Sequence, residues 1–262
     1  MKVVQLGALG VVLFAATTVR AQAEGEPYVD RSAPIRSRSA TEKAQNSGAF
    51  LPQTLAARLN AGRAFVSVNG GFDGARNQPI MSAVTEVQLW GPIALRGGAE
   101  YSANRETMRP TIGARVQLLN QREHGVDGSV GTFYRPEGFT EPEGEIETAV
   151  ALGRQAGRLA LLGNLVYGQD PEGNERDGEV RVAARYDMDR WSLGFDGRAR
   201  FAIGAQNNPK AAAEPKVDLI AGPLAAVTIG PLALFTQIGA SVLKTTETHA
   251  GIAALGGVGS GF

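Results

Sequence analysis

From about residue 62 onward, apolar and polar side chains alternate along the chain with a period of two. Between Val180 and Met188, for example, every second residue is apolar, whereas Arg181, Arg185 and Asp187 occupy positions between them. This period predicts β-strands that have one apolar face and one polar face. Each such segment has about the 9–11 residues that a tilted strand needs to cross a bilayer.

About twelve such segments follow one another, and single-chain bacterial barrels have an even number of strands. Their predicted bounds are 62–72, 81–90, 93–103, 109–119, 125–135, 144–154, 157–168, 178–188, 190–202, 215–229, 231–243 and 250–262. Tight connections such as Gly91-Pro92 and Asp189 alternate with longer ones at 169–177, 203–214 and 244–250. The pattern therefore predicts an all-β fold, a transmembrane antiparallel up-and-down β-barrel over residues 62–262.

Aromatic residues on the apolar faces gather near the ends of the predicted strands. If the first strand runs outward, the outer ends carry Phe72, Tyr101, Tyr134, Tyr167 and Phe201, and the inner ends carry Tyr186, Trp191 and Phe262. Two such girdles are expected where amphipathic rings lie at the level of lipid headgroups.

The stretch from Ile220 to Leu243 has no charged residue and is long enough to cross a membrane as a helix. Pro223, Pro231 and the glycines of this stretch disfavour a helix. We therefore expect two strands here, with a possible bulge at Pro223.

The N-terminal part of the chain has a different composition. Residues 1–23 have the pattern of a secretory signal peptide, with an apolar core and a small-x-small motif that predicts cleavage after Ala23; an uncleaved membrane anchor is the alternative. Residues 24–61 are polar and rich in Ser, Pro and Arg, which predicts a flexible, disordered periplasmic leader. Within it, leucines four residues apart predict a possible short helix at 51–59, which lies either in the periplasm or inside the barrel.

The signal peptide, the alternating strands, the asymmetric connections, the girdles and the terminal aromatic together resemble bacterial outer-membrane β-barrel proteins as a class. The resemblance implies a location in the outer membrane, contact with outer-membrane lipid, a periplasmic N-terminus and insertion by the barrel-assembly machinery. It also implies that Phe262, which closes the last strand, is the assembly signal. The resemblance is architectural and indicates no particular family or substrate.

The polar strand faces carry nearly balanced charges, which we expect to point into the lumen. The residues predicted to line the lumen are Arg96, Glu100, Arg115, Asp127, Glu147, Arg158, Arg181, Arg185, Asp196, Arg198 and Arg200. Hairpin geometry predicts three cross-strand pairs, namely Arg115 with Asp127, Glu147 with Arg158, and Arg181 with Asp196. Such an interior either satisfies its own charges or forms a narrow pore that selects anions.

The leading functional hypothesis is a small passive barrel, which is either a narrow channel for small polar or anionic solutes or a closed structural barrel. One alternative is an outer-membrane hydrolase that uses His249, and another is an interaction or translocator barrel that its N-terminal leader plugs. We do not expect an enzyme, because the two histidines, His124 and His249, fall at opposite ends of the predicted barrel. No motif indicates a cofactor or a metal, the formal net charge of zero gives no reason to expect nucleic acid, and the sequence leaves the oligomeric state open.

Overall fold

The computed structural model describes residues 51–59, 64–103, 107–138, 144–170, 176–203 and 216–261 of the 262-residue chain. The predicted signal peptide with its cleavage after Ala23, the leader up to residue 50 and the predicted assembly signal at Phe262 lie outside the described residues.

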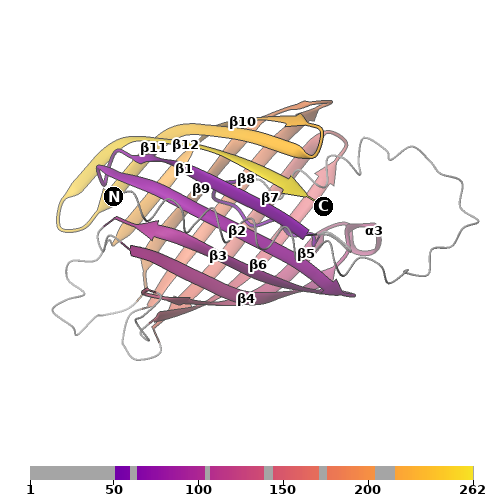
Figure 1. Cartoon of the computed structure of the whole chain (residues 1–262), viewed down its shortest axis with the longest axis horizontal. Coiled ribbons are helices and arrows are strands. Elements are labelled where there is room, and N and C mark those ends of the chain that lie inside the picture. Colours follow the sequence, from indigo (N-terminus) through magenta and orange to yellow (C-terminus); the bar gives the residue numbers. More distant parts are fainter. Residues whose placement is uncertain are drawn as a thin grey trace, which may run out of the picture.

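Twelve antiparallel strands form one closed barrel in which each strand pairs with its neighbours in the sequence and β12 pairs with β1 (Figure 1). The strands are β1 (Ala64–Asp73), β2 (Gln78–Trp90), β3 (Ile93–Ser102), β4 (Thr107–Leu119), β5 (Asp127–Pro136), β6 (Gly144–Ala156), β7 (Leu159–Gln169), β8 (Arg176–Met188), β9 (Trp191–Ala202), β10 (Val217–Ile229), β11 (Leu232–Lys244) and β12 (Thr248–Gly261). Every predicted segment overlaps one of these strands. The predicted fold, a barrel of twelve antiparallel strands, is confirmed.

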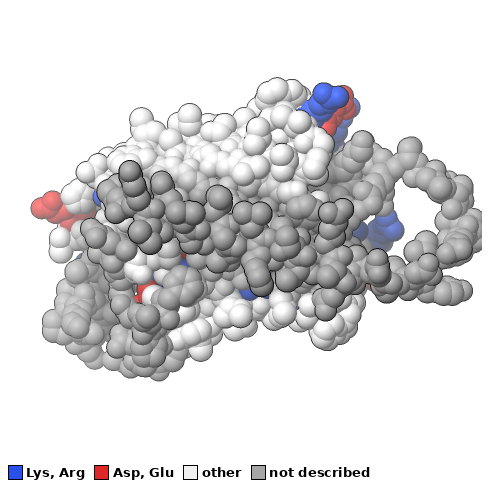
Figure 2. Space-filling model, in the orientation of Figure 1, with Lys and Arg blue, Asp and Glu red and all other residues white. Residues whose placement is uncertain are grey.

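The alternation of side chains separates an apolar outer surface from a polar lumen. In β6, Glu147 and Ala151 are buried, whereas Ile146, Val150 and Leu152 are exposed. Figure 2 shows that the described surface visible from one side is mostly uncharged between the two ends, where charged side chains gather. An apolar outer band of this kind suits the hydrocarbon core of a bilayer.

The two ends of the barrel differ in their connections. At one end, the short-turn end, two-residue turns join β2 to β3, β6 to β7, β8 to β9 and β10 to β11. Gly91 and Gly157 have φ values of 49° and 59° in these turns, a left-handed conformation that glycine adopts without steric cost. The β4–β5 connection at the same end contains α3 (Gln121–His124), a single turn that sequence reasoning missed. The remaining connections define the long-loop end.

Two local expectations need correction. The β11–β12 connection contains only residues 245–247, so His249 lies in β12 rather than in a long loop. The uncharged stretch does form two strands, but Pro223 causes no bulge: pairing of β10 with β11 stops after Ala221 and resumes in the same register at Leu224. Because proline has no N–H to donate, the ladder has a gap at this point.

Candidate functional site

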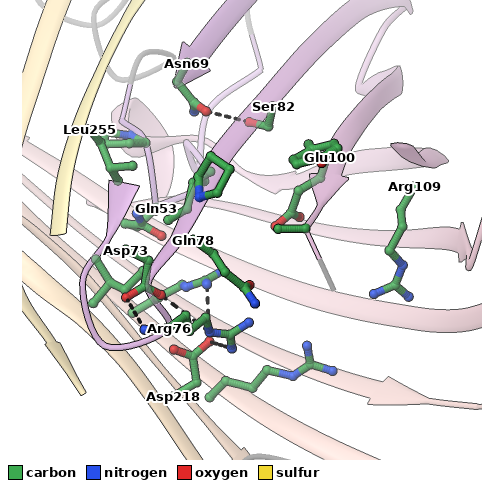
Figure 3. Close-up of a pocket in the computed structure, with 18 of the residues that line it drawn as sticks. Gln53, Asn69, Asp73, Arg76, Gln78, Ser82, Glu100, Arg109, Asp218 and Leu255 are labelled. Atoms are coloured by element: carbon green, nitrogen blue, oxygen red, sulfur yellow. Dashed lines mark hydrogen bonds and ion pairs between the residues drawn. The ribbon is translucent and has the colours of Figure 1, made fainter. Parts of the chain in front are cut away.

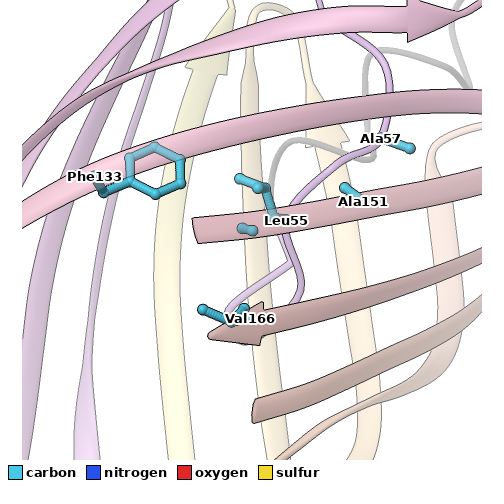
Figure 4. Packing of buried hydrophobic residues seen from close by; sticks show 6 residues of the cluster. Leu55, Ala57, Phe133, Ala151 and Val166 are labelled. Carbon is cyan, nitrogen blue, oxygen red and sulfur yellow. The ribbon is translucent and has the colours of Figure 1, made fainter. Parts of the chain in front are cut away.

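Nine residues that precede the barrel, Leu51–Leu59, lie inside it; we call them the lumen segment. Within the segment, Leu55 and Ala57 pack against Phe133, Ala151 and Val166 of the barrel wall, as Figure 4 shows. Ala57 is 1% exposed. The wall is therefore apolar where this part of the segment touches it.

The first residue of the lumen segment has a second apolar contact. Leu51 packs with Ala183, Leu224 and Phe235, which project inward from β8, β10 and β11. Apolar side chains that face a water-filled lumen would be unfavourable, whereas the same side chains under the leucines of the segment are removed from water. The apolar side chains of the wall are thus complementary to the lumen segment.

Polar side chains of the wall bind the backbone of the lumen segment. Asp196 in β9, which is 0% exposed, accepts hydrogen bonds from the Gln53 N–H (2.8 Å) and from the Thr54 hydroxyl (2.5 Å). Asn164 in β7 makes a double hydrogen bond with Leu55: its Oδ1 accepts from the Leu55 N–H (2.7 Å), and its Nδ2 donates to the Leu55 carbonyl (2.9 Å).

Two side chains of β4 bind the second half of the segment. Arg115 donates to the Ala56 carbonyl, and Gln117 Oε1 accepts from the Leu59 N–H (3.0 Å). Arg115 is itself held by an ion pair with Glu86 (2.8 Å) and by a hydrogen bond to the Ser129 hydroxyl (2.8 Å).

The predicted helix at 51–59 is wrong, because the segment is irregular and contains no helical turn. Backbone groups that a helix would pair internally, such as the N–H and carbonyl of Leu55, pair with side chains of the wall instead. Sequence reasoning also missed Asn164 and Gln117 as binding groups. The one available signal was their uncharged polar character on strand faces that point inward.

Beyond the lumen segment, toward the long-loop end, the lumen opens into a cavity of about 180 Å³ that we call the vestibule (Figure 3). Its charged lining residues are Asp73, Arg76, Glu100, Arg109, Arg135, Glu179, Arg198, Arg200 and Asp218. Most of these charges are paired. The ion pairs are Arg76 with Asp73 (3.4 Å) and Asp218 (2.8 Å), Arg198 with Asp218 (3.3 Å), Arg135 with Glu147 (2.8 Å), Arg181 with Glu179, and Arg200 with Asp177 and Glu145 (3.4 Å).

A smaller cavity of about 50 Å³ lies beside the lumen segment. Ser67, Glu86 and Arg96 line it from the wall, and Asn69 and Ser82 line both this cavity and the vestibule. The lumen segment thus packs on apolar side chains of the wall in one direction and leaves polar space along β1–β3 in the other.

The structure places most of the predicted lumen residues inside the barrel. Arg115, Asp127, Glu147, Arg185 and Asp196 are buried. Arg96, Glu100, Arg115, Arg198 and Arg200 line the two cavities, and Arg181 is half-buried in its pair with Glu179. Arg158 is the exception, because it is exposed in the turn between β6 and β7.

The three predicted cross-strand pairs do not form. Glu147 pairs with Arg135 rather than with Arg158, and Arg115 reaches past its neighbouring strand to Glu86 in β2. Asp127 instead accepts a hydrogen bond from the Gln121 N–H (2.9 Å) at the start of α3. Long arginine side chains and turn backbone compete for the carboxylates, so the strand register alone did not predict the partners.

Ser241 and His249, the residues of the hydrolase alternative, do not form a hydrogen-bonded pair among the described residues. Ser241, which is 1% exposed, donates its hydroxyl hydrogen to Asp73, whereas His249 is exposed on β12. The register sets Ser241 opposite Gly251 and His249 opposite Leu243. A serine–histidine pair must be within hydrogen-bond reach to activate the serine, and no hydrogen bond links these two residues in the described part of the chain.

No protein-family model matches the chain, and no curated protein sequence matches it. Among solved structures, the KdgM porin has a TM-score of 0.52 at 7% identity, and the match covers 76% of this chain and 99% of that one. The NanC porin has a TM-score of 0.53 at 10% identity, with 74% of this chain and 98% of that one covered. LpxR from Salmonella typhimurium is a more distant match, with a TM-score of 0.47 at 8% identity. The match covers 76% of this chain and 99% of LpxR.

At this level of identity the likeness shows the fold alone. The chain has the fold of bacterial outer-membrane β-barrel proteins, and more narrowly that of small porin-like barrels of twelve strands. No helix in the described part of the chain is long and apolar enough to span a membrane.

Proposed function

We propose that this protein spans the outer membrane as a small channel for polar solutes, and that its own lumen segment closes the channel at rest. The observation that carries the proposal is the placement of Leu51–Leu59 inside the barrel, where side chains of β4, β7 and β9 bind its backbone. The porin-like fold and the apolar outer surface are consistent with a membrane channel.

The lumen segment is held weakly enough to leave. At least six hydrogen bonds between described residues join it to the wall, and each contributes about 1 kcal/mol net. Burial of its leucine side chains adds about 2 kcal/mol each. Ordering the backbone of the nine residues costs about 1–2 kcal/mol per residue, a total of about the same size as this gain. Because the free energy gained by binding and the cost of ordering nearly cancel, the lumen segment suits a gate that can be displaced.

The charge pattern favours small polar solutes over anions. Arg135, Arg198 and Arg200 all project toward the vestibule, but each is paired with a carboxylate. A strongly anion-selective pore needs positive charge that the protein itself does not neutralise. Arg109 forms no ion pair among the described residues, but Glu100 stands opposite it, so the vestibule has no excess of positive charge at this point.

A closed structural barrel is the second candidate, since the same contacts that gate a channel also fill a barrel that never opens. The two functions differ in whether the lumen segment leaves. Replacing residues 51–59 with a glycine–serine linker of the same length removes the leucines and Thr54 but keeps the chain connected.

Planar-bilayer recording distinguishes the two candidates. The linker variant is expected to show stable conductance steps, and the native chain to show rare, brief openings. A linker variant that inserts, shifts on gels after heating as folded barrels do, and still shows no steps at any voltage would refute the channel proposal.

A further inference from the structure

Among the described residues of the vestibule, one negative and one positive side chain make no hydrogen bond and no ion pair. Glu100 in β3 and Arg109 in β4 are direct cross-strand neighbours, yet in the described part of the chain neither makes a hydrogen bond or an ion pair. Every other charged residue that lines the vestibule is in an ion pair. The Nε of Arg109 is buried without an acceptor.

This arrangement is unusual for a barrel interior. Opposite charges on facing strand positions normally pair directly, whereas these two half-buried side chains leave their hydrogen-bonding groups unused by the described wall. Arg109, Arg135 and Arg198 lie within electrostatic range of Glu100, but Arg109 forms no ion pair with it, and Arg135 and Arg198 are bonded to Glu147 and Asp218. Figure 3 shows Glu100 and Arg109 projecting from neighbouring strands into the same open space.

We propose that the vestibule binds a small zwitterion of the α-amino acid type, with its ammonium group on Glu100 and its carboxylate on Arg109. Such a ligand supplies one charge of each sign and so gives Glu100 and Arg109 each a direct hydrogen-bonding partner. Hydrogen bonds between oppositely charged groups are stronger than those between neutral groups. The volume of about 180 Å³ is smaller than the roughly 300–1,000 Å³ of sites for drug-sized ligands, which favours a ligand of only a few heavy atoms.

The inference rests on the proposed function in one respect, because it takes the bound zwitterion to be the solute that the channel admits. The binding site itself does not depend on conduction. Binding is therefore measured on the folded full chain in detergent, and conductance is measured separately in bilayers. Glycine binding without conduction would contradict the channel, and conduction without glycine binding would contradict the site.

Calorimetric titration tests the site with three probes: glycine, N-acetylglycine and glycinamide. The native chain is expected to bind glycine at least about tenfold more tightly than either single-charge analogue, since each analogue leaves one charge unpaired. Equal affinity for the three probes, or no binding of glycine, would overturn the proposal without any variant.

Single substitutions test whether Glu100 binds the ammonium group and Arg109 binds the carboxylate. Glu100→Gln is expected to weaken glycine binding about tenfold and to leave N-acetylglycine binding unchanged, whereas Arg109→Gln weakens both. Glu123→Gln and Arg122→Gln are matched controls, because both residues are exposed on α3 at the opposite end of the barrel. If Glu100→Gln and Arg109→Gln bound glycine as the controls do, the assignment would be wrong.

Discussion

Replacing Asn164 with alanine tests how tightly the lumen segment is held. The substitution removes both hydrogen bonds to the Leu55 backbone, at 2.7 and 2.9 Å, and otherwise loses only a local bond to the Gly163 carbonyl. At about 1 kcal/mol for each of the two bonds, the closed state is destabilised by about 2 kcal/mol, which is about a thirtyfold change in the ratio of open to closed channels.

Single-channel recording measures this ratio directly as open probability. Asn69→Ala is the matched control, because Asn69 also points into the lumen but hydrogen-bonds to Ser82 of the wall rather than to the lumen segment. An open probability for Asn164→Ala that equals that of Asn69→Ala would refute the reasoning, since the two substitutions remove the same side chain and differ in whether it binds the segment.

Two further predictions concern the barrel itself. Arg115→Met should lower the stability of the barrel by about 3 kcal/mol, because the arginine is 1% exposed and its loss leaves the buried Glu86 with Arg96 alone. Urea unfolding checks this, and an unchanged midpoint relative to the exposed control Arg122→Met would contradict it. Deleting Phe262 should slow insertion into liposomes that contain the barrel-assembly machinery, while conductance of the inserted fraction stays the same; insertion at the native rate would show that Phe262 is not the assembly signal.

Much of the barrel was predictable because the constraint on each strand is local. A strand that separates lipid from a polar lumen must alternate with a period of two, and this alternation alone placed the buried Glu147 and Asp196 inward. It also resolved the uncharged stretch around Pro223 into two strands. These are properties of a few consecutive residues.

The conformation of the lumen segment was not predictable in the same way. The contacts that set its conformation join Thr54 to Asp196 and Leu55 to Asn164, which are 142 and 109 residues apart in the chain. The spacing of the leucines is the same in a helix and in this irregular segment, so periodicity could not distinguish them. Arg158 was misplaced for a simpler reason: it was assigned to the predicted strand 157–168, whereas β7 begins at Leu159, one residue after it.

A reversible disulfide between the lumen segment and the wall tests the gate most directly. A Cβ atom placed on Gly153 of β6 lies 3.0 Å from the Ala57 Cβ, close to the roughly 3.5–4.5 Å of disulfides, and the chain contains no cysteine of its own. Ala57→Cys and Gly153→Cys are therefore combined with Asn164→Ala, so that the unlocked channel opens often enough to record.

The measurement is the conductance of this triple variant before and after reduction, with thiol labelling to confirm that the disulfide has formed. The oxidised protein is expected to be silent, and reduction should restore the open probability of Asn164→Ala alone. If the oxidised and reduced proteins conduct equally, the lumen segment does not gate the channel, and the central claim is contradicted.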